Sequence, residues 1–304
     1  MPSVAVFGTF MMDLVAYTSR RPRNGETIRG EAFSMALGGK GFNQAIAARR
    51  SGVETVMLGN LGKDGFGGSF LSALKSEGVK FRDIEMHDDL GTGVGHISVQ
   101  TSDGDNAIII IPQSNDYADK SYVSRHKMAF LHSDILLIQN ELPITANVAA
   151  AKAAKEGKAK VILTPAPVGQ MESLKGLCDV VVPNEGEAEA ITGISCNELE
   201  KQALALTEYF DCREVVITLG PNGAFVKNEF SSVLISTPKV NAIDTIAAGD
   251  TLCASLAARL AHGDDLFTAA RYGVYAATLK VTRKGSAMSS PTPEEVNEFM
   301  KGKK

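Results

Sequence analysis

Residues 244–250 read Asp-Thr-Ile-Ala-Ala-Gly-Asp, so three residues with little or no side chain precede the second carboxylate. Apolar residues then recur at helical spacing, at Leu252, Leu256, Ala257 and Leu260. The stretch predicts a turn that leads into a helix, whose first N–H groups are free to bind an anion. Small residues at the turn allow a ligand to come close to the backbone.

Asp250 falls at this helix start, beside any phosphate bound there. A carboxylate repels a phosphate, so we interpret Asp250 as a general base that takes a proton from a hydroxyl attacking the phosphorus. The alternative is an ordinary N-cap aspartate, which is common at helix starts. The segment alone leaves both interpretations open.

Outward from this segment, short apolar runs alternate with helical patterns. The expected strands are residues 4–8, 56–59, 134–138, 161–163, 180–182 and 215–219. The expected helices are residues 43–51, 67–78, 146–157, 185–193 and 199–210. This alternation predicts an α/β fold with a mostly parallel sheet covered by helices on both faces.

Two regions, residues 13–37 and 93–111, lack helical spacing and read as pairs of strands. We expect them to form a small β-sheet inserted into a single domain that spans residues 1–304. Isoleucines at 108–111 would give this sheet an apolar face, which needs a partner surface. The sheet is interpreted as a lid over a site, a homodimer contact or both; a meander packed on the main domain is the alternative.

The composition is that of a soluble globular enzyme, with 44% hydrophobic and 22% charged residues among 304. A net charge of −4 gives no indication of a nucleic-acid partner. Four widely spaced cysteines argue against zinc and disulfide frameworks and for a reducing, cytoplasmic location. No apolar run approaches the ~20 residues of a membrane span, and the five histidines share no metal-ligand spacing.

Residues 38–45, Gly-Gly-Lys-Gly-Phe-Asn-Gln-Ala, form a second glycine-dense turn that opens a helix. No Walker A frame fits them, and the chain has no protein-kinase catalytic-loop signature. Alone, this turn is a weak signal, and a surface turn explains it equally well.

Taken together, residues 38–45 and 244–250 resemble the two signature segments of the ribokinase family of carbohydrate kinases, the PfkB-type fold. Further landmarks follow in order: Glu141 after an expected strand, the Asn-x-x-Glu segment 184–187, the glycine turn 218–223 and Val-Thr-Arg-Lys-Gly at 281–285. The resemblance covers essentially the whole chain. It implies a three-layer α/β/α fold with a mostly parallel central sheet and a small β-sheet lid.

The resemblance implies that Asp250 is the general base and that Ala247, Ala248 and Gly249 form the anion hole for the γ-phosphate. Backbone N–H groups at a helix start supply part of the stabilisation that phosphoryl transfer needs.

On the sugar side, the resemblance assigns substrate binding to Asp13, Gly39, Asn43 and Glu141. Carboxylates and amides bond hydroxyls in fixed directions. Lys40 lies in the same loop, where a ligand contact and a lysine in solvent are both open.

The resemblance also implies ATP, Mg²⁺ and a monovalent cation, K⁺. Asn184 and Glu187 would arrange Mg²⁺ through its waters. Thr218, Gly220, Gly223 and Gly249 would line the nucleotide. Without the family, Glu187 reads as a solvated carboxylate and residues 220–223 as a hairpin turn. For K⁺, Asp244 and Ile246 match one side of the site, while Lys280, Arg283, Gly285 and Ser289 match the other, mostly through backbone carbonyls.

Met11 departs from the family, in which asparagine bonds a sugar hydroxyl at this position. Methionine has no hydrogen-bond donor and only a weak acceptor. Burying a sugar hydroxyl against it would therefore weaken the binding of that sugar by roughly 1–3 kcal/mol. Met11 therefore predicts tolerance of, or preference for, 2-deoxyribose, and kinases of deoxyribose carry a similar Met-x-Asp-Leu segment. The alternative is that Met11 fills space and ribose still binds. Residues 109–115 and Val274 also depart from the sequence pattern of the ribokinase family.

The predicted function is ATP-dependent phosphorylation of the primary hydroxyl of a free pentose, ribose or 2-deoxyribose, to the sugar 5-phosphate. Another free sugar or a nucleoside is an alternative substrate within the family. A sugar-binding regulator without catalysis is an alternative from a different class. The intact Asp250 and Gly249 argue against it, because a pure binder needs no base beside a phosphate site.

Overall fold

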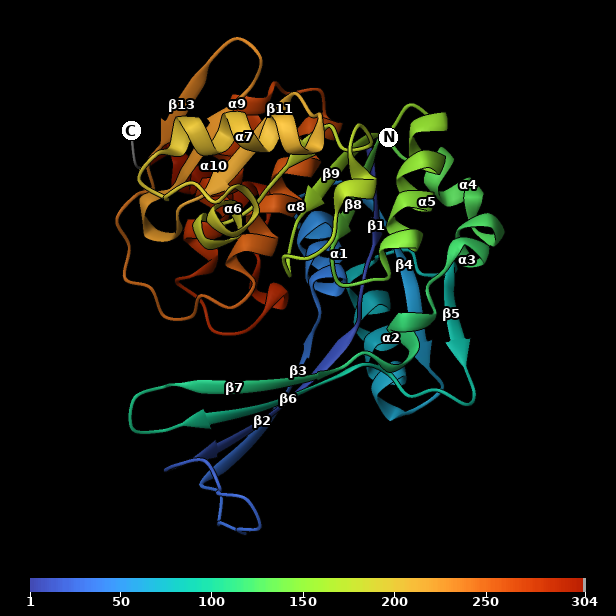
Figure 1. The fold of residues 1–304 in the computed structure, drawn as a ribbon, viewed down its shortest axis with the longest axis vertical. Helices are drawn as coiled ribbons and strands as arrows, with labels where there is room; N and C mark the ends of the chain where they lie inside the picture. Colours follow the sequence, from blue (N-terminus) through green and yellow to red (C-terminus); the bar gives the residue numbers. More distant parts are fainter. Residues whose placement is uncertain (303–304) are drawn as a thin grey trace.

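In the computed structural model, which describes residues 1–302, nine strands form a central sheet in the order β13-β12-β11-β10-β9-β8-β1-β4-β5 (Figure 1). They are β1 (Ser3–Phe7), β4 (Glu54–Gly62), β5 (Ile84–His87), β8 (Ile135–Gln139), β9 (Lys160–Thr164), β10 (Val180–Val181), β11 (Glu214–Thr218), β12 (Ala224–Lys227) and β13 (Ser232–Ile235). Neighbouring strands run parallel, apart from β12, which is antiparallel to β11 and β13. The mostly parallel sheet is as expected.

Helices cover both faces of this sheet. One face carries α1 (Lys40–Arg50), α2 (Gly65–Glu77), α8 (Ala248–Ala261) and α9 (Leu266–Lys280), with α10 (Pro293–Lys301) packed on α9. The other carries α3 (Lys120–Arg125), α4 (Lys127–Leu131), α5 (Ile144–Glu156), α6 (Glu185–Thr192) and α7 (Leu199–Phe210). Side chains alternate between the two faces along each strand, so the sheet separates two apolar cores. The fold is therefore a three-layer α/β/α arrangement.

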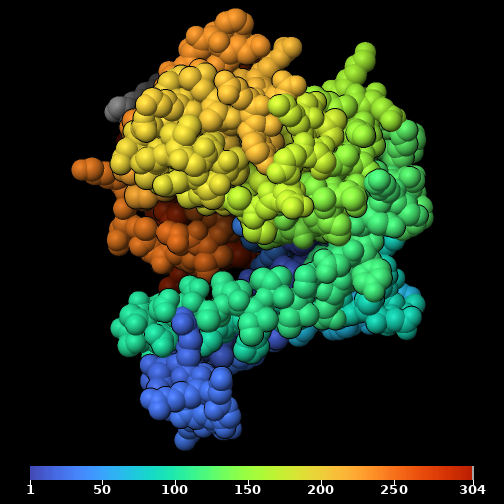
Figure 2. Space-filling view, in the orientation of Figure 1, coloured from blue at the N-terminus to red at the C-terminus, as the bar shows by residue number. Residues whose placement is uncertain are grey.

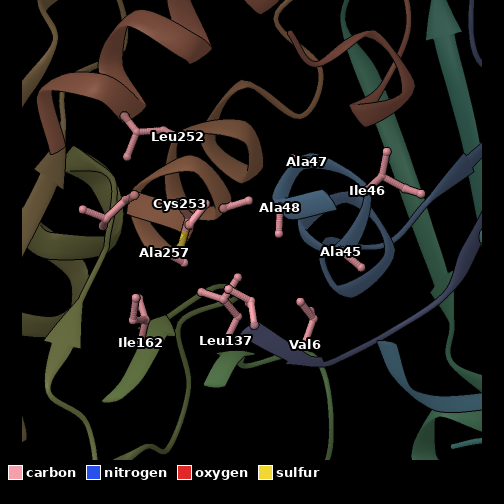
Figure 3. Close-up of a cluster of buried hydrophobic side chains, with 14 of the residues drawn as sticks. Val6, Ala45, Ile46, Ala47, Ala48, Leu137, Ile162, Leu252, Cys253 and Ala257 are labelled. Carbon is pink, nitrogen blue, oxygen red and sulfur yellow. The ribbon is translucent and has the colours of Figure 1, made fainter. Parts of the chain in front are cut away.

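Small residues let α1 and α8 lie close together on the sheet. Figure 3 shows Ala48 of α1 and Ala257 of α8 above Val6 of β1 and Leu137 of β8, all of them fully buried. This packing places the starts of α1 and α8 at the carboxyl edge of the sheet, where open α/β folds bind their ligands.

A second sheet, in the order β3-β2-β6-β7, projects from the main body (Figure 1). Its strands are β2 (Met11–Thr18), β3 (Ala32–Gly38), β6 (Val94–Gln100) and β7 (Asn106–Ile111). Figure 2 shows the molecule hollowed between this sheet and the α8–α9 side of the body. The four isoleucines of β7, with Phe33 and Met35 of β3, are exposed. The expected lid sheet is present, and the homodimer contact and the single domain stay predictions.

No helix within residues 1–302 is long and apolar enough to cross a membrane. The four cysteines are free. The described residues contain no group of three or more His, Cys, Asp or Glu side chains that could hold a metal ion.

Two glycines allow α1 to cross the end of β1 at close range. A Cβ atom on Gly41 would lie 2.5 Å from the carbonyl carbon of Gly8 and from the nitrogen of Thr9. A Cβ atom on Gly8 would lie 2.1 Å from Oε1 of Gln139. The backbone N–H of Phe42 donates to the carbonyl of Thr9 at 3.1 Å across the same crossing. The crossing therefore excludes any side chain larger than hydrogen at these two positions.

The substitution Gly41→Ala is expected to lower the free energy of unfolding by about 1–3 kcal/mol, because the added methyl group meets backbone atoms that cannot rotate away. The matched control is Gly68→Ala in α2, where a Cβ atom meets nothing within 4 Å. That change should stabilise by about 0.5–1 kcal/mol through the lower entropy of the unfolded chain. Urea unfolding measures both, and equal effects of the two changes would contradict the close crossing.

Candidate active site

The start of α8 presents free backbone donors at the carboxyl edge of the sheet. Ala247, the N-cap, has φ 57° and ψ 20°, a left-handed conformation, and no side chain caps the helix. Within the described chain, the N–H groups of Gly249 and Asp250 have no hydrogen-bond acceptor. The helix dipole adds partial positive charge at the same end. This geometry suits an anion.

The carboxylate of Asp250 is held by two amides of α1. Its Oδ2 accepts from Nδ2 of Asn43 at 3.2 Å, and its Oδ1 accepts from Nε2 of Gln44 at 3.1 Å. Gln44 is itself held by Nε2 of Gln139, which donates to Oε1 of Gln44 at 2.7 Å. Burial raises the pKa of Asp250, while the charge of Lys40 and the two amide bonds oppose the rise. A raised pKa moves a carboxylate towards the range of a general base.

Lys40 lies inside the site rather than in open solvent. Burial, the largest single influence, lowers its pKa, but the charges of Asp250, Glu141 and Glu187 together outweigh burial and raise the pKa. The side chain is therefore a cation among three carboxylates. It lines a cavity of about 190 Å³ together with Asn184, Glu187, Thr218 and residues 247–250.

Two further carboxylates lie on the lid side of Asp250. Oε2 of Glu141 accepts from the backbone N–H of Lys40 at 3.0 Å and from the hydroxyl of Thr9. Burial, and then the charge of Glu141, raises the pKa of Asp13 to about 6. No donor within residues 1–302 is bonded to the partly buried Asp13 carboxylate, and Oδ1 of Asn43 is buried without a partner. A ligand that carries hydroxyl groups would supply donors to these acceptors.

Glycines make room for the Asp13 carboxylate between the strands of the small sheet. A Cβ atom on Gly38 would lie 2.4 Å from Oδ2 of Asp13, and one on Gly95 would lie 2.7 Å from Oδ1. Gly39 has φ 89°, and a Cβ atom there would lie 2.7 Å from the carbonyl oxygen of Thr9. Gly39 thus belongs to the turn that joins the small sheet to α1.

Met11 is buried at the junction between the two sheets. Its Sδ lies 3.4 Å from Nδ2 of Asn115, and the side chain is 6% exposed. Asn115 also holds the backbone of Phe10, whose N–H donates to its Oδ1 at 3.1 Å and whose carbonyl accepts from its Nδ2 at 2.9 Å. The departure at residues 109–115 therefore directly contacts the departure at Met11.

Asn184 and Glu187 form a capping box at the start of α6. The two oxygens of Glu187 accept from the backbone N–H of Asn184 at 2.8 Å and from its Nδ2 at 2.9 Å. Both residues also line the small cavity that contains Asp250. This single carboxylate, already bonded to Asn184, fits Mg²⁺ held through water rather than a dedicated cage of carboxylates.

A second cavity, of about 780 Å³, adjoins the first, and Thr245 and Ala248 line both. Its wall is largely apolar and includes Leu252 and Val274. The turn between β11 and β12 closes one side, with Gly220 at φ 51° and Gly223 at φ 104°. A Cβ atom on Gly223 would lie 1.8 Å from the carbonyl oxygen of Ile235, so glycine is required. Size and lining suit a planar base.

A larger cavity, of about 910 Å³, lies at the opposite edge of the sheet, where Lys160 and Glu214 begin their strands. It shares no lining residue with the two cavities at the carboxyl edge. Charges of both signs line it without a helix start. We therefore assign the candidate active site to the two smaller cavities at the carboxyl edge of the sheet.

The residues expected to bind a monovalent cation lie near one another. Lys280 contacts this group through its side-chain ammonium as well as through its backbone carbonyl. Its Nζ donates to the backbone carbonyl of Asp244 at 3.0 Å, and its own carbonyl accepts from the N–H of Arg283 at 2.9 Å. The carboxylate of Asp244 accepts from the N–H groups of Ile246 and Gly285, both at 2.9 Å. The hydroxyl of Ser289 donates to the carbonyl of Gly285 at 3.2 Å. An ammonium thus contacts Asp244, one of the residues expected to bind a free cation.

The sequence interpretation missed four residues that shape the site, namely Thr9, Gln44, Gln139 and Thr164. Gln44 had a visible signal, because it is a polar residue directly before the apolar run of residues 45–48 and is fully buried. The other three had none, since their contacts join segments that are distant in the chain.

Comparisons with known proteins agree with this geometry. The model of the family described as pfkB family carbohydrate kinase matches residues 1–293. Ribokinase of Haemophilus influenzae is 34% identical over 301 residues, 98% of each chain, and deoxyribokinase of Salmonella typhi is 30% identical with the same coverage. The structure of Arabidopsis thaliana ribokinase complexed with ribose and ATP superposes with a TM-score of 0.92, at 28% identity, over 99% of this chain and 98% of that one. The expected fold and family are confirmed: the chain is a sugar kinase and belongs to the pfkB family of carbohydrate kinases.

Proposed function

We propose that the protein transfers the γ-phosphoryl group of ATP to the primary hydroxyl of a free pentose, ribose or 2-deoxyribose, and releases the sugar 5-phosphate. The observation that carries the proposal is the position of Asp250. Its carboxylate lies at the uncapped start of α8, between the cavities on one side and the acceptors of Asp13, Asn43 and Glu141 on the other.

The acceptor cluster supports a polyhydroxylated substrate. Asp13 and Oδ1 of Asn43 lack donors within the described chain, and a sugar supplies several hydroxyl donors in fixed directions. The relatives named above include kinases of ribose and of deoxyribose, and the Arabidopsis structure contains ribose and ATP.

In the proposed reaction Asp250 accepts the proton of the attacking hydroxyl. Its amide partners on α1 fix the orientation of its carboxylate towards that hydroxyl. The N–H groups of Gly249 and Asp250 stabilise the charge that grows on the transferred phosphoryl oxygens. Lys40 adds a positive charge in the same cavity. Thr245, Ala248 and Leu252, with Gly220 and Gly223, would line the nucleotide. Asn184 and Glu187 would hold Mg²⁺ through water, and the ion neutralises phosphate charge when bound.

The substitution Asp250→Asn should lower kcat by roughly 10²–10⁴-fold, because an amide cannot accept the proton. ADP release over a panel of ribose, 2-deoxyribose, fructose and nucleosides measures it. The control is Asp89→Asn, an exposed carboxylate for which the structure gives no hydrogen bond, and it should leave turnover unchanged.

Full turnover by the Asp250→Asn variant would contradict its role as base. If the wild-type protein phosphorylates only fructose or a nucleoside, that compound and not a pentose is its substrate. Tight sugar binding without any turnover would favour a sugar-binding regulator.

At Met11, the substitution Met11→Asn should raise the ratio of kcat/KM for ribose over 2-deoxyribose. The added amide would stabilise bound ribose by about 1–3 kcal/mol, which corresponds to a rise of roughly 5–150-fold in this ratio. The control Met35→Asn makes the same change on the exposed face of β3 and should leave the ratio unchanged. An unchanged ratio in Met11→Asn would show that Met11 only fills space.

The raised pKa of Asp13 predicts a pH dependence. Folding moves this pKa from 3.8 to about 6, so the carboxyl favours the folded protein below pH 3.8 and this contribution is lost as pH rises through about 6. The substitution Asp13→Asn removes the titrating group and so abolishes this loss of stability with rising pH. The melting temperature of the variant should therefore exceed that of the wild type by more at about pH 7 than at about pH 5. Thermal unfolding of the sugar-free protein measures it, and a gain that is equal at both pH values would contradict the shifted pKa.

A further inference from the structure

Lys280 is the one charged side chain within residues 1–302 that is fully buried, at 0% exposure. It is the last residue of α9, and its side chain reaches the loop that leads into α8. No step of the proposed reaction uses it. A buried ammonium is unfavourable by several kcal/mol unless an opposite charge or a dipole compensates it, so its position calls for an explanation.

Three partners compensate the charge. The ammonium donates to the carbonyl of Asp244 at 3.0 Å and lies 3.9 Å from Oδ1 of the same residue. The carboxyl end of α9 contributes negative partial charge. Burial lowers the pKa of Lys280, and the charge of Asp244 opposes this change.

The loop held in this way carries the anion-binding N–H groups. Asp244 lies six residues before Asp250. Its carboxylate ties the N–H of Ile246 within the loop and the N–H of Gly285 across to the turn that follows α9. Ala247 then turns into the left-handed conformation that starts α8. A charge that stabilises Asp244 therefore stabilises the geometry of the helix start.

A free monovalent cation at Asp244, as the family resemblance implies, would lie beside the ammonium of Lys280, and the two like charges would repel each other. Both carboxylate oxygens of Asp244, the carbonyl of Lys280 and the hydroxyl of Ser289 are engaged within the chain. Arg283 is paired with Glu295 at 2.7 Å, and Lys284 is exposed, so neither competes for Asp244.

We propose that the ammonium of Lys280 replaces the monovalent cation: it neutralises Asp244 from within the chain, fixes residues 244–249, and makes the folded site independent of K⁺. An ammonium carries the same single charge and bonds oxygen at a similar distance. Lys280 acts here as a positioning residue, since it lies behind the loop. The activity part of the inference rests on the proposed kinase function, whereas the stability part does not.

The test compares potassium chloride with choline chloride at matched ionic strength, with two readouts: the melting temperature of the ligand-free protein, and kcat for whichever sugar turns over. The wild-type protein should give the same values in both salts. Lys280→Met keeps the volume but removes the charge, and it should lose about tenfold or more in kcat and also lower the melting temperature, with no restoration by K⁺. Lys280→Ala leaves space, so K⁺ should restore part of both values. The control is Lys284→Ala, which removes an exposed charge from the same turn and should behave as the wild type.

A several-fold rise of wild-type kcat in potassium, or a higher wild-type melting temperature there, would overturn the proposal. So would a Lys280→Met protein that matches the wild type in choline, or a Lys280→Ala protein that loses activity without any response to K⁺, since packing alone would then explain Lys280. If neither variant folds, the wild-type comparison still decides. If no sugar is phosphorylated, the melting temperatures test this inference separately from the proposed function.

Discussion

The site depends on the pair of hydrogen bonds between α1 and the carboxylate of Asp250. Asn43 and Gln44 are separated from Asp250 by 207 and 206 positions in the chain, yet their amides hold its two oxygens. The bonds exist because small residues let α1 and α8 pack closely, and because Gly8 and Gly41 let α1 cross the end of β1. Any change that moves one helix relative to the other therefore moves the carboxylate of Asp250.

Electrostatics around this crossing follow from unequal burial. Asp250 and Glu141 keep raised pKa values because their burial is only partly compensated by Lys40 and neighbouring donors. Burial, and then the charge of Glu141, raises the pKa of Asp13 to about 6, and no donor in the described chain opposes this rise. The loop before α8 thus lies between two cations. Lys40 faces the cavity, and Lys280 is buried behind the loop against Asp244.

Several elements could be predicted from local pattern. The strand expected at residues 4–8 is β1, and that at 215–219 is β11, because buried parallel strands are continuous apolar runs. The helix expected from residue 43 begins at Lys40, since a glycine turn hides the first turn from periodicity. The antiparallel strands β12 and β13 were not predicted, because they are short and half exposed, which weakens the apolar signal.

From the sequence alone came the α/β class, the lid sheet, the two glycine-rich turns and the interpretation of Asp250 as a general base, all of which depend on residue type and spacing along short segments. The tertiary structure decided which groups meet. It placed Gln44 on Asp250, Asn115 on Met11 and the ammonium of Lys280 on Asp244. These contacts depend on the packing of helices and strands that are distant in the chain. The direction in which a long side chain such as lysine points is determined by that packing and not by its neighbours in sequence.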